Sequence, residues 1–154
     1  MCIRDSPWGG GGTWSFKLDD PKHILNQAFK GSGFWLKDEI YQYKPETYVG
    51  DDKLRVLVSL DLNTEQTMKP LNRNEGLKKQ YTEGGRTVPV SWIRSFEGGR
   101  VFYTNLGHNA STYWNPAVLQ HYLDGLQYAL GDLKADATPS SKITREEVLA
   151  PPAP

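Results

Sequence analysis

The stretch LRVLVSL, residues 54–60, decides the predicted fold class more than any other segment. Its apolar side chains are almost continuous, whereas a strand with one solvated face alternates apolar and polar residues. Such a strand is buried on both faces and needs covering layers above and below its sheet. The stretch therefore predicts an α/β domain. An all-β domain is the alternative, and the missing alternation argues against it.

Four further segments have the periodicity or the aromatic content of β-strands: residues 13–18, 34–43, 88–96 and 100–106. The last two are separated by Glu97, Gly98 and Gly99, a spacing typical of an antiparallel hairpin with a glycine at positive φ. Residues 63–86 are polar and aperiodic, and we predict a long loop there.

One helix is predicted between Asn115 and Gly131. Asn115 can cap it, Pro116 occupies the favoured first position, and Gly131 ends it. Its apolar stripe, expected to face the core, comprises Val118, Leu119, Tyr122, Leu123, Leu126, Ala129 and Leu130. His121 lies opposite this stripe, so we predict that it is exposed to solvent.

The predicted helices are too few to cover residues 54–60 on both faces. We therefore interpret the chain as the C-terminal part of a larger α/β domain, and we expect the fragment alone to be poorly stable. Residues 1–6 (MCIRDS) lack any structural period and are interpreted as a non-native leader or assembly scar. Residues 7–133 form the domain part, and the polar, Pro- and Ala-rich residues 134–154 form a tail or linker.

Composition argues against several classes of function. Lys plus Arg equals Asp plus Glu at 18 each, which disfavours a nucleic-acid partner. No apolar run approaches the ~20 residues that cross a bilayer, so we expect a soluble chain without a membrane partner. Cys2 is the only cysteine, which excludes an internal disulfide. The compartment stays open between cytoplasmic and exported.

His108 is the first candidate for chemistry. It follows a predicted strand and Gly107, and the ligands of open α/β sheets gather at the carboxyl ends of strands. A histidine there can act as a general acid or base near neutral pH, whereas the structural alternative is a hydrogen bond to the loop backbone. The three histidines are too dispersed for a metal-ligand spacing, so a zinc site is possible only by tertiary convergence and no metal ligand is predicted.

Asp38 and Glu39 are adjacent, so on a strand their side chains point to opposite faces. They can share one site only where the strand has ended or bulged. We expect Asp38 to be partly buried. Its favoured role is a structural ion pair with Arg55 or Arg100. Glu39 would share its face with aromatic residues including Tyr41, a surface suited to a sugar.

Three more residues are candidate ligand contacts. Asp61 ends the central strand and lies near His108 if both strands run parallel, although an Asx turn into Asn63 is the favoured alternative. Trp114 follows the His108 loop and can either stack on a sugar ring or brace the loop. His23 is a loop histidine without an evident partner.

Together these segments resemble the ThuA-like (trehalose utilisation) family, from about Trp8 to Leu133. The matching motifs are Asp20-Pro21-Lys22-His23, Asp38-Glu39-Ile40-Tyr41, Pro89-Val90-Ser91-Trp92, residues 99–108 (GRVFYTNLGH) and the helix between Asn115 and Gly131. The segment 99–108 is a specific match. One departure is visible: the family usually has proline after the first histidine, and this chain has Ile24 there.

The resemblance implies a flavodoxin-like fold similar to class I glutamine amidotransferases, with three α/β/α layers whose N-terminal βα units are missing here. In those relatives a histidine after a late strand pairs with a cysteine nucleophile. His108 is the positional counterpart, but the only cysteine of this chain is Cys2. Glutamine hydrolysis is therefore not expected, unless the absent N-terminal part supplies the nucleophile.

The resemblance also implies a role in carbohydrate utilisation, with trehalose, another disaccharide or a keto-sugar as ligand, and with reaction and cofactor unassigned. His108, Glu39 and Asp38 are the predicted catalytic residues, and the predicted substrate contacts are Tyr41, Asn109, Trp114, His23 and Asp61. A non-catalytic sugar-binding or regulatory module is the alternative, and a structural domain joined through the tail is a weaker one. A homo-oligomer is compatible with each reading.

Overall fold

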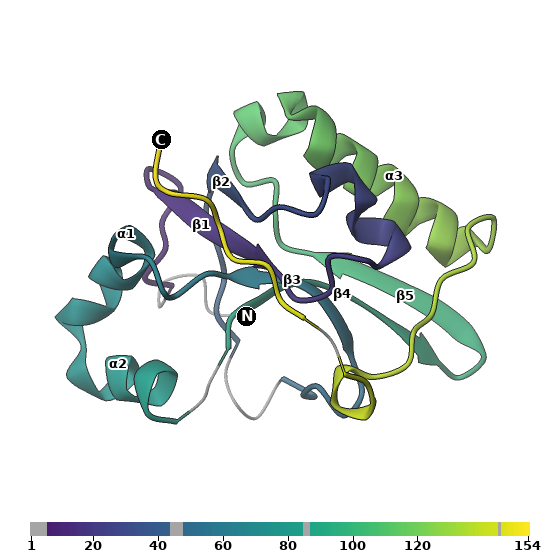
Figure 1. The fold of residues 1–154 in the computed structure, drawn as a ribbon, viewed down its shortest axis with the longest axis horizontal. Coiled ribbons are helices and arrows are strands. Elements are labelled where there is room, and N and C mark those ends of the chain that lie inside the picture. Colours follow the sequence, from purple (N-terminus) through teal and green to yellow (C-terminus); the bar gives the residue numbers. More distant parts are fainter. Residues whose placement is uncertain (1–5, 44–47, 85–86, 145) are drawn as a thin grey trace.

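A computed structural model describes residues 6–43, 48–84, 87–144 and 146–154. Its strands are β1 (Thr13–Leu18), β2 (Phe34–Lys37), β3 (Arg55–Leu60), β4 (Pro89–Phe96) and β5 (Gly99–Thr104). Its α-helices are α1 (Glu65–Met68), α2 (Glu75–Thr82) and α3 (Pro116–Leu130), and its 3₁₀ helices are Ile24–Phe29, Lys69–Arg73, Ala110–Trp114 and Ser140–Lys142. Figure 1 shows α3 packed beside β5, and α1 and α2 together at one end of the molecule.

The strands form one sheet in the order β2-β1-β3-β4-β5, and every neighbouring pair is antiparallel. Consequently β2, β3 and β5 run in the same direction and finish at the same end of the sheet. Helices packed on this sheet confirm the α/β class. A flavodoxin-like sheet is mostly parallel, so the antiparallel order does not confirm that finer prediction.

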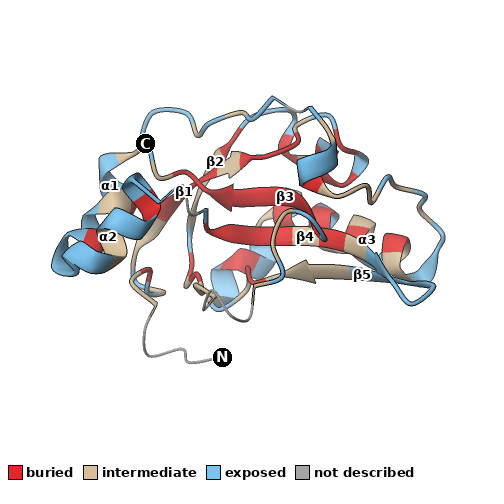
Figure 2. Ribbon diagram, turned by 90° about the horizontal axis from the view of Figure 1, so that it is seen from below, coloured by how far each residue is buried: buried red, intermediate tan, exposed pale blue. Residues whose placement is uncertain are grey.

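All six residues of β3 are buried, as Figure 2 shows for the centre of the sheet. This confirms the two-sided burial predicted from residues 54–60. Leu57, Val58 and Leu60 belong to a hydrophobic core that also includes Leu71, from the 3₁₀ helix Lys69–Arg73. The central strand therefore obtains part of its cover from the segment that follows it in the chain.

The long loop predicted over residues 63–86 is wrong. The described part of this segment forms α1, the 3₁₀ helix Lys69–Arg73 and α2. The Asn74 side chain caps α2 by accepting a hydrogen bond from the Leu77 N–H at 2.9 Å. The longest of these helices has eight residues, which is too short for a helical period to stand out in a polar sequence.

The described part of residues 134–154 adds hydrogen bonds at the end of β1 and at the start of β3, where the adjacent strand does not extend. The Ser140 N–H donates to the Leu54 carbonyl at 2.9 Å, and the Ser140 hydroxyl accepts from the Val56 N–H at 2.8 Å. Leu18 and Val148 form an isolated antiparallel bridge with both bonds at 2.9 Å. This segment therefore lies along the sheet. The division of the chain at residue 134 stays a prediction.

The β4–β5 hairpin and the ends of α3 are confirmed. The turn residues Glu97 and Gly98 have φ values of 48° and 80°, as a two-residue turn with both central residues at positive φ requires. Asn115 caps α3 through its side chain, and Gly131 ends it at φ 97°. No described helix has the length and hydropathy of a membrane span.

The buried face of α3 differs from the predicted stripe. Its buried residues are Val118, His121, Gly125 and Tyr128, whereas Leu119, Leu123, Leu126 and Leu130 are exposed. An added Cβ at Gly125 would lie 2.3 Å from Phe102 Cδ1, so this glycine lets the helix approach β5 closely.

The prediction that His121 is exposed is therefore wrong. Its Nδ1 bonds the Leu25 carbonyl at 2.7 Å, and its Nε2 bonds the Ser91 hydroxyl at 2.8 Å. Two polar partners let the ring occupy the core, which helical periodicity cannot reveal.

Candidate functional site

The loops that follow β2 and β5 meet at the end of the sheet where β2, β3 and β5 finish. Asp38, the first residue after β2, is fully buried. Its Oδ2 accepts from the Gly107 N–H at 2.6 Å, and its Oδ1 accepts from the Asn109 N–H at 2.9 Å. Hydrogen bonds from backbone N–H groups to a carboxylate are charge-assisted and strong. Asp38 therefore fixes the loop that carries His108.

The predicted ion pair between Asp38 and Arg55 or Arg100 is not formed. Arg55 pairs with Asp20 instead, and Arg100 Nε donates to the Tyr128 carbonyl at 2.8 Å. The burial predicted for Asp38 is confirmed, but backbone N–H groups satisfy its charge. Sequence spacing cannot reveal such partners, because any residue except proline supplies a backbone N–H.

Glu39 and His108 lie together at this loop. The His108 Nδ1 is 3.3 Å from the Glu39 Oε2, with side-chain exposures of 46% for His108 and 15% for Glu39. The strand predicted over residues 34–43 ends at Lys37, so Asp38 and Glu39 both reach the β5 loop. In the neutral ring, an Nδ1–H directed at Glu39 leaves Nε2 as the proton acceptor. This arrangement can exchange a proton with a ligand.

The glycine run at residues 9–12 lies against this pair, a contact that the sequence analysis missed. A Cβ added at Gly10 would lie 2.8 Å from His108 Cδ2 and 3.1 Å from Asn109 Oδ1. The Asn109 Nδ2 donates to the Gly10 carbonyl at 2.7 Å and to the Lys37 carbonyl at 2.9 Å. Both amide hydrogens of Asn109 are therefore used, and its Oδ1 is left to accept from a ligand.

Gly107 turns the loop at φ 112°, a conformation that favours glycine and that its position in the sequence indicates. The Tyr113 hydroxyl donates to the Gly107 carbonyl at 3.0 Å, and the Tyr122 hydroxyl donates to the Leu106 carbonyl at 2.8 Å. Burial raises the pKa of Tyr122, which keeps its hydroxyl a donor. These two tyrosines brace the loop, and neither was predicted from the sequence as a site residue.

Tyr41 connects the loop to an aromatic cluster on β4 and β5. The Asn105 Nδ2 donates to the Tyr41 carbonyl at 3.3 Å and to the Tyr43 hydroxyl at 3.1 Å. The Tyr43 hydroxyl in turn donates to the Tyr103 hydroxyl at 2.9 Å. Trp92 stacks on Tyr103 with ring centroids 4.2 Å apart. Burial, helped by the bond to Tyr103, raises the pKa of Tyr43.

Asp61 and Trp114 do not contact His108. β3 and β5 run in the same direction, yet Asp61 forms the alternative Asx turn, with Oδ1 accepting from the Asn63 N–H at 3.0 Å. Its Oδ2 accepts from the Ala150 N–H at 2.9 Å. Trp114 is 81% exposed at the end of a 3₁₀ helix. Their roles as substrate contacts stay predictions.

His23 lies beyond the end of β1, away from the His108 loop. Its Nδ1 accepts from the Leu25 N–H at 3.3 Å, and its Nε2 bonds the Asp136 carbonyl at 3.0 Å. Burial lowers the pKa of His23. Within the described ranges no group of three His, Cys, Asp or Glu side chains is arranged to hold a metal ion. Cys2 lies outside the described residues.

The fold and the site thus define an α/β domain with a histidine–carboxylate pair on loops at the end of its sheet. The family model for ThuA, described as trehalose utilisation, matches residues 8–129, which include Asp38, Glu39 and His108. The chain belongs to the ThuA family. No curated protein and no solved structure matches it.

Proposed function

We propose that this chain handles a carbohydrate at the His108 loop, with trehalose, another disaccharide or a keto-sugar as its ligand class. The observation that carries the proposal is the 3.3 Å contact between His108 and Glu39 on a loop that Asp38 fixes. Membership of the ThuA family supports the carbohydrate class. The geometry supports a residue that moves a proton.

In this proposal Glu39 orients the imidazole and His108 exchanges the proton. With Nδ1–H directed at Glu39, the His108 Nε2 accepts a proton from a sugar hydroxyl or a water molecule. The imidazolium that forms is stabilised by the Glu39 carboxylate beside it. Asp38 acts as a positioning residue, because backbone N–H groups already occupy both of its oxygens.

Three further side chains complete the proposed ligand surface: Tyr41, Asn109 and Trp114. Asn109 offers its Oδ1 as an acceptor for a hydroxyl. Trp114 exposes most of its ring, and an aromatic face of this kind can stack on a sugar. His23 and Asp61 are not included in this surface, because neighbouring residues already bond their polar atoms, and their roles as substrate contacts stay predictions.

The flavodoxin-like three-layer arrangement stays part of the proposal, and membership of the ThuA family is its main support. Two-sided burial of β3 is in keeping with it, and the antiparallel strand order counts against it. Cysteine-dependent glutamine hydrolysis is not proposed, because Cys2 is the only cysteine in the sequence.

Calorimetric titration with trehalose, other disaccharides and keto-sugars, run beside product analysis, tests the proposal. We expect binding with conversion, and we expect Glu39→Gln to reduce conversion while Glu83→Gln, an exposed control on another element, leaves it unchanged. Binding without conversion favours the non-catalytic sugar-binding module. If none of the sugars in the panel binds, the proposal is contradicted.

A further inference from the structure

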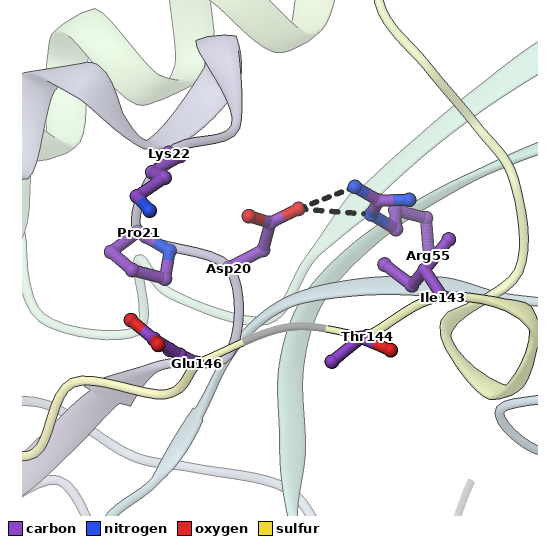
Figure 3. A pocket seen from close by; sticks show the side chains of 7 residues that line it. All are labelled: Asp20, Pro21, Lys22, Arg55, Ile143, Thr144 and Glu146. Atoms are coloured by element: carbon purple, nitrogen blue, oxygen red, sulfur yellow. Dashed lines mark hydrogen bonds and ion pairs between the residues drawn. The ribbon is translucent and has the colours of Figure 1, made fainter.

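A cavity of about 220 Å³ lies at the opposite end of the sheet from His108. Figure 3 shows the residues that line it: Asp20, Pro21, Lys22, Arg55, Ile143, Thr144 and Glu146. Arg55 begins β3, whereas His108 follows the end of β5, which runs in the same direction. The six residues of β3 span about 20 Å from one end of the sheet to the other. The cavity is therefore separate from the His108 site.

Arg55 and Asp20 form the buried wall of the cavity. Arg55 donates from Nε at 3.0 Å and from Nη2 at 2.5 Å to one oxygen, Asp20 Oδ2. Its Nη1 donates to Asp136 Oδ2 at 3.3 Å and to the Thr138 carbonyl at 3.1 Å. A guanidinium has five N–H groups, so one N–H of Nη2 is left without an acceptor in the described part of the chain.

The second oxygen of Asp20, Oδ1, also lacks a partner among the described residues, although the side chain is only 10% exposed. Figure 3 shows this oxygen on the side of the carboxylate away from Arg55, toward Pro21 and Lys22. A hydroxyl of a ligand in the cavity can donate a hydrogen bond to this oxygen. Asp20 thus offers one acceptor oxygen, and Arg55, which also lines the cavity, retains one unused N–H donor.

We propose that this cavity binds a neutral single-ring polyol of the monosaccharide type. One hydroxyl donates to Asp20 Oδ1, and a ring substituent accepts from the remaining Arg55 N–H. Pro21 and Ile143 supply apolar surface for the C–H face of the ring, and Thr144 adds a hydroxyl. The proposal goes beyond the function assigned to the His108 loop, because it concerns a second site.

Charge and size favour a neutral polyol over an ion. The lining has two cations, Lys22 and Arg55, and two carboxylates, Asp20 and Glu146, so neither an anion nor a cation gains a net attraction. A volume of about 220 Å³ is below the range of about 300–1,000 Å³ typical of sites for drug-sized ligands, and it suits one small ring.

The cavity also accounts for the motif Asp20-Pro21-Lys22-His23, which the His108 site leaves unexplained. Three of its residues line the cavity, and His23 caps the 3₁₀ helix Ile24–Phe29 directly after them. Burial of His23 against Leu25 and Asp136 holds this turn in place. The motif therefore shapes a binding surface even though its histidine does not face the ligand.

An NMR titration of the full chain with methyl α-D-glucopyranoside tests this proposal. We expect saturable shifts of the Lys22 and Thr144 amides and of the Arg55 Nε–H, with affinity on the order of millimolar. Lys22→Ala removes part of the lining and Thr144→Val removes its hydroxyl, so each change, at an exposed position, should weaken binding about three- to tenfold. Lys142→Ala, another exposed lysine outside the lining, should leave binding unchanged.

His108→Ala should also leave this binding unchanged, which separates a failure here from a failure of the proposed function. The proposal is overturned if these signals show no saturable shift, or if Lys22→Ala and Thr144→Val bind like the wild type. It is also overturned if inorganic phosphate or L-alanine shifts the same signals while the glucoside does not.

Discussion

Asp38 and Gly107 are 69 residues apart in the sequence and are joined by a 2.6 Å hydrogen bond that links the loops after the two outer strands of the sheet. Asp38 holds Asn109 in the same way at 2.9 Å. His108 lies between these two anchored residues, so its position depends on a carboxylate that follows the opposite edge strand. One buried side chain thereby couples the fold to the candidate site.

Asp38→Asn tests this coupling. Asparagine keeps one acceptor oxygen but turns an NH₂ group toward a backbone N–H, so we expect a loss of about 2–4 kcal/mol in the free energy of unfolding. Urea unfolding measures it. Asp132→Asn, at an exposed position, should stay within about 0.5 kcal/mol of the wild type. Equal stability of the two variants would contradict the anchoring role.

Gly10→Ala should displace the His108 ring. The new Cβ would lie 2.8 Å from His108 Cδ2, closer than real contacts allow, whereas a Cβ at Gly9 meets nothing within 4 Å. We expect shifted imidazole proton resonances of His108 in Gly10→Ala and unchanged ones in Gly9→Ala. The expected cost in stability is about 1–3 kcal/mol for Gly10→Ala. Identical His108 spectra in both variants argue against contact with the glycine run.

Acidification should destabilise the fold through His121. Burial lowers its pKa from 6.5 to about 4, so protonation favours the unfolded chain. The stabilisation is complete above pH 6.5 and is lost as the pH falls toward 4. At about 1.4 kcal/mol per pH unit this amounts to roughly 3 kcal/mol.

Urea unfolding across this pH range checks the prediction for His121. The variant His121→Gln should be less stable at pH 7 and should show a flatter pH dependence, because glutamine does not titrate. If the free energy of unfolding of His121→Gln depends on pH as in the wild type, another group causes the acid sensitivity.

Two helical glycines should respond to alanine in opposite directions. Gly125→Ala places a Cβ 2.3 Å from the Phe102 ring and should cost about 1–3 kcal/mol. Gly76 in α2 has only ordinary contact at 3.6 Å, so Gly76→Ala should stabilise the chain by about 0.5–1 kcal/mol. Thermal melts of both variants measure this difference. A stabilised Gly125→Ala would refute the close approach of α3 to β5.

The sequence predicts elements whose signals are local and misses features that depend on distant partners. The Asn115 cap, the Gly131 stop and the Glu97-Gly98 turn are set by neighbouring residues, and all three are confirmed. His121 is buried because Leu25 and Ser91, far away in the chain, supply its hydrogen bonds. Helical periodicity does not reveal such distant partners.

The candidate site shows the same division. The position of His108 after a strand and Gly107 is readable from the sequence, as is the burial of Asp38. The contact of Gly10 with His108, the N–H partners of Asp38 and the tyrosines that brace the loop all depend on how separate segments meet in space. A single sequence contains no signal for these contacts.

Turnover by His108→Ala tests whether His108 moves a proton for a bound sugar. With the sugar that product analysis identifies, we expect kcat to fall about 10²–10⁴-fold relative to the wild type. The melting temperature should stay nearly unchanged, because the His108 side chain is 46% exposed. Wild-type turnover by a folded His108→Ala variant would show that His108 does not move the proton.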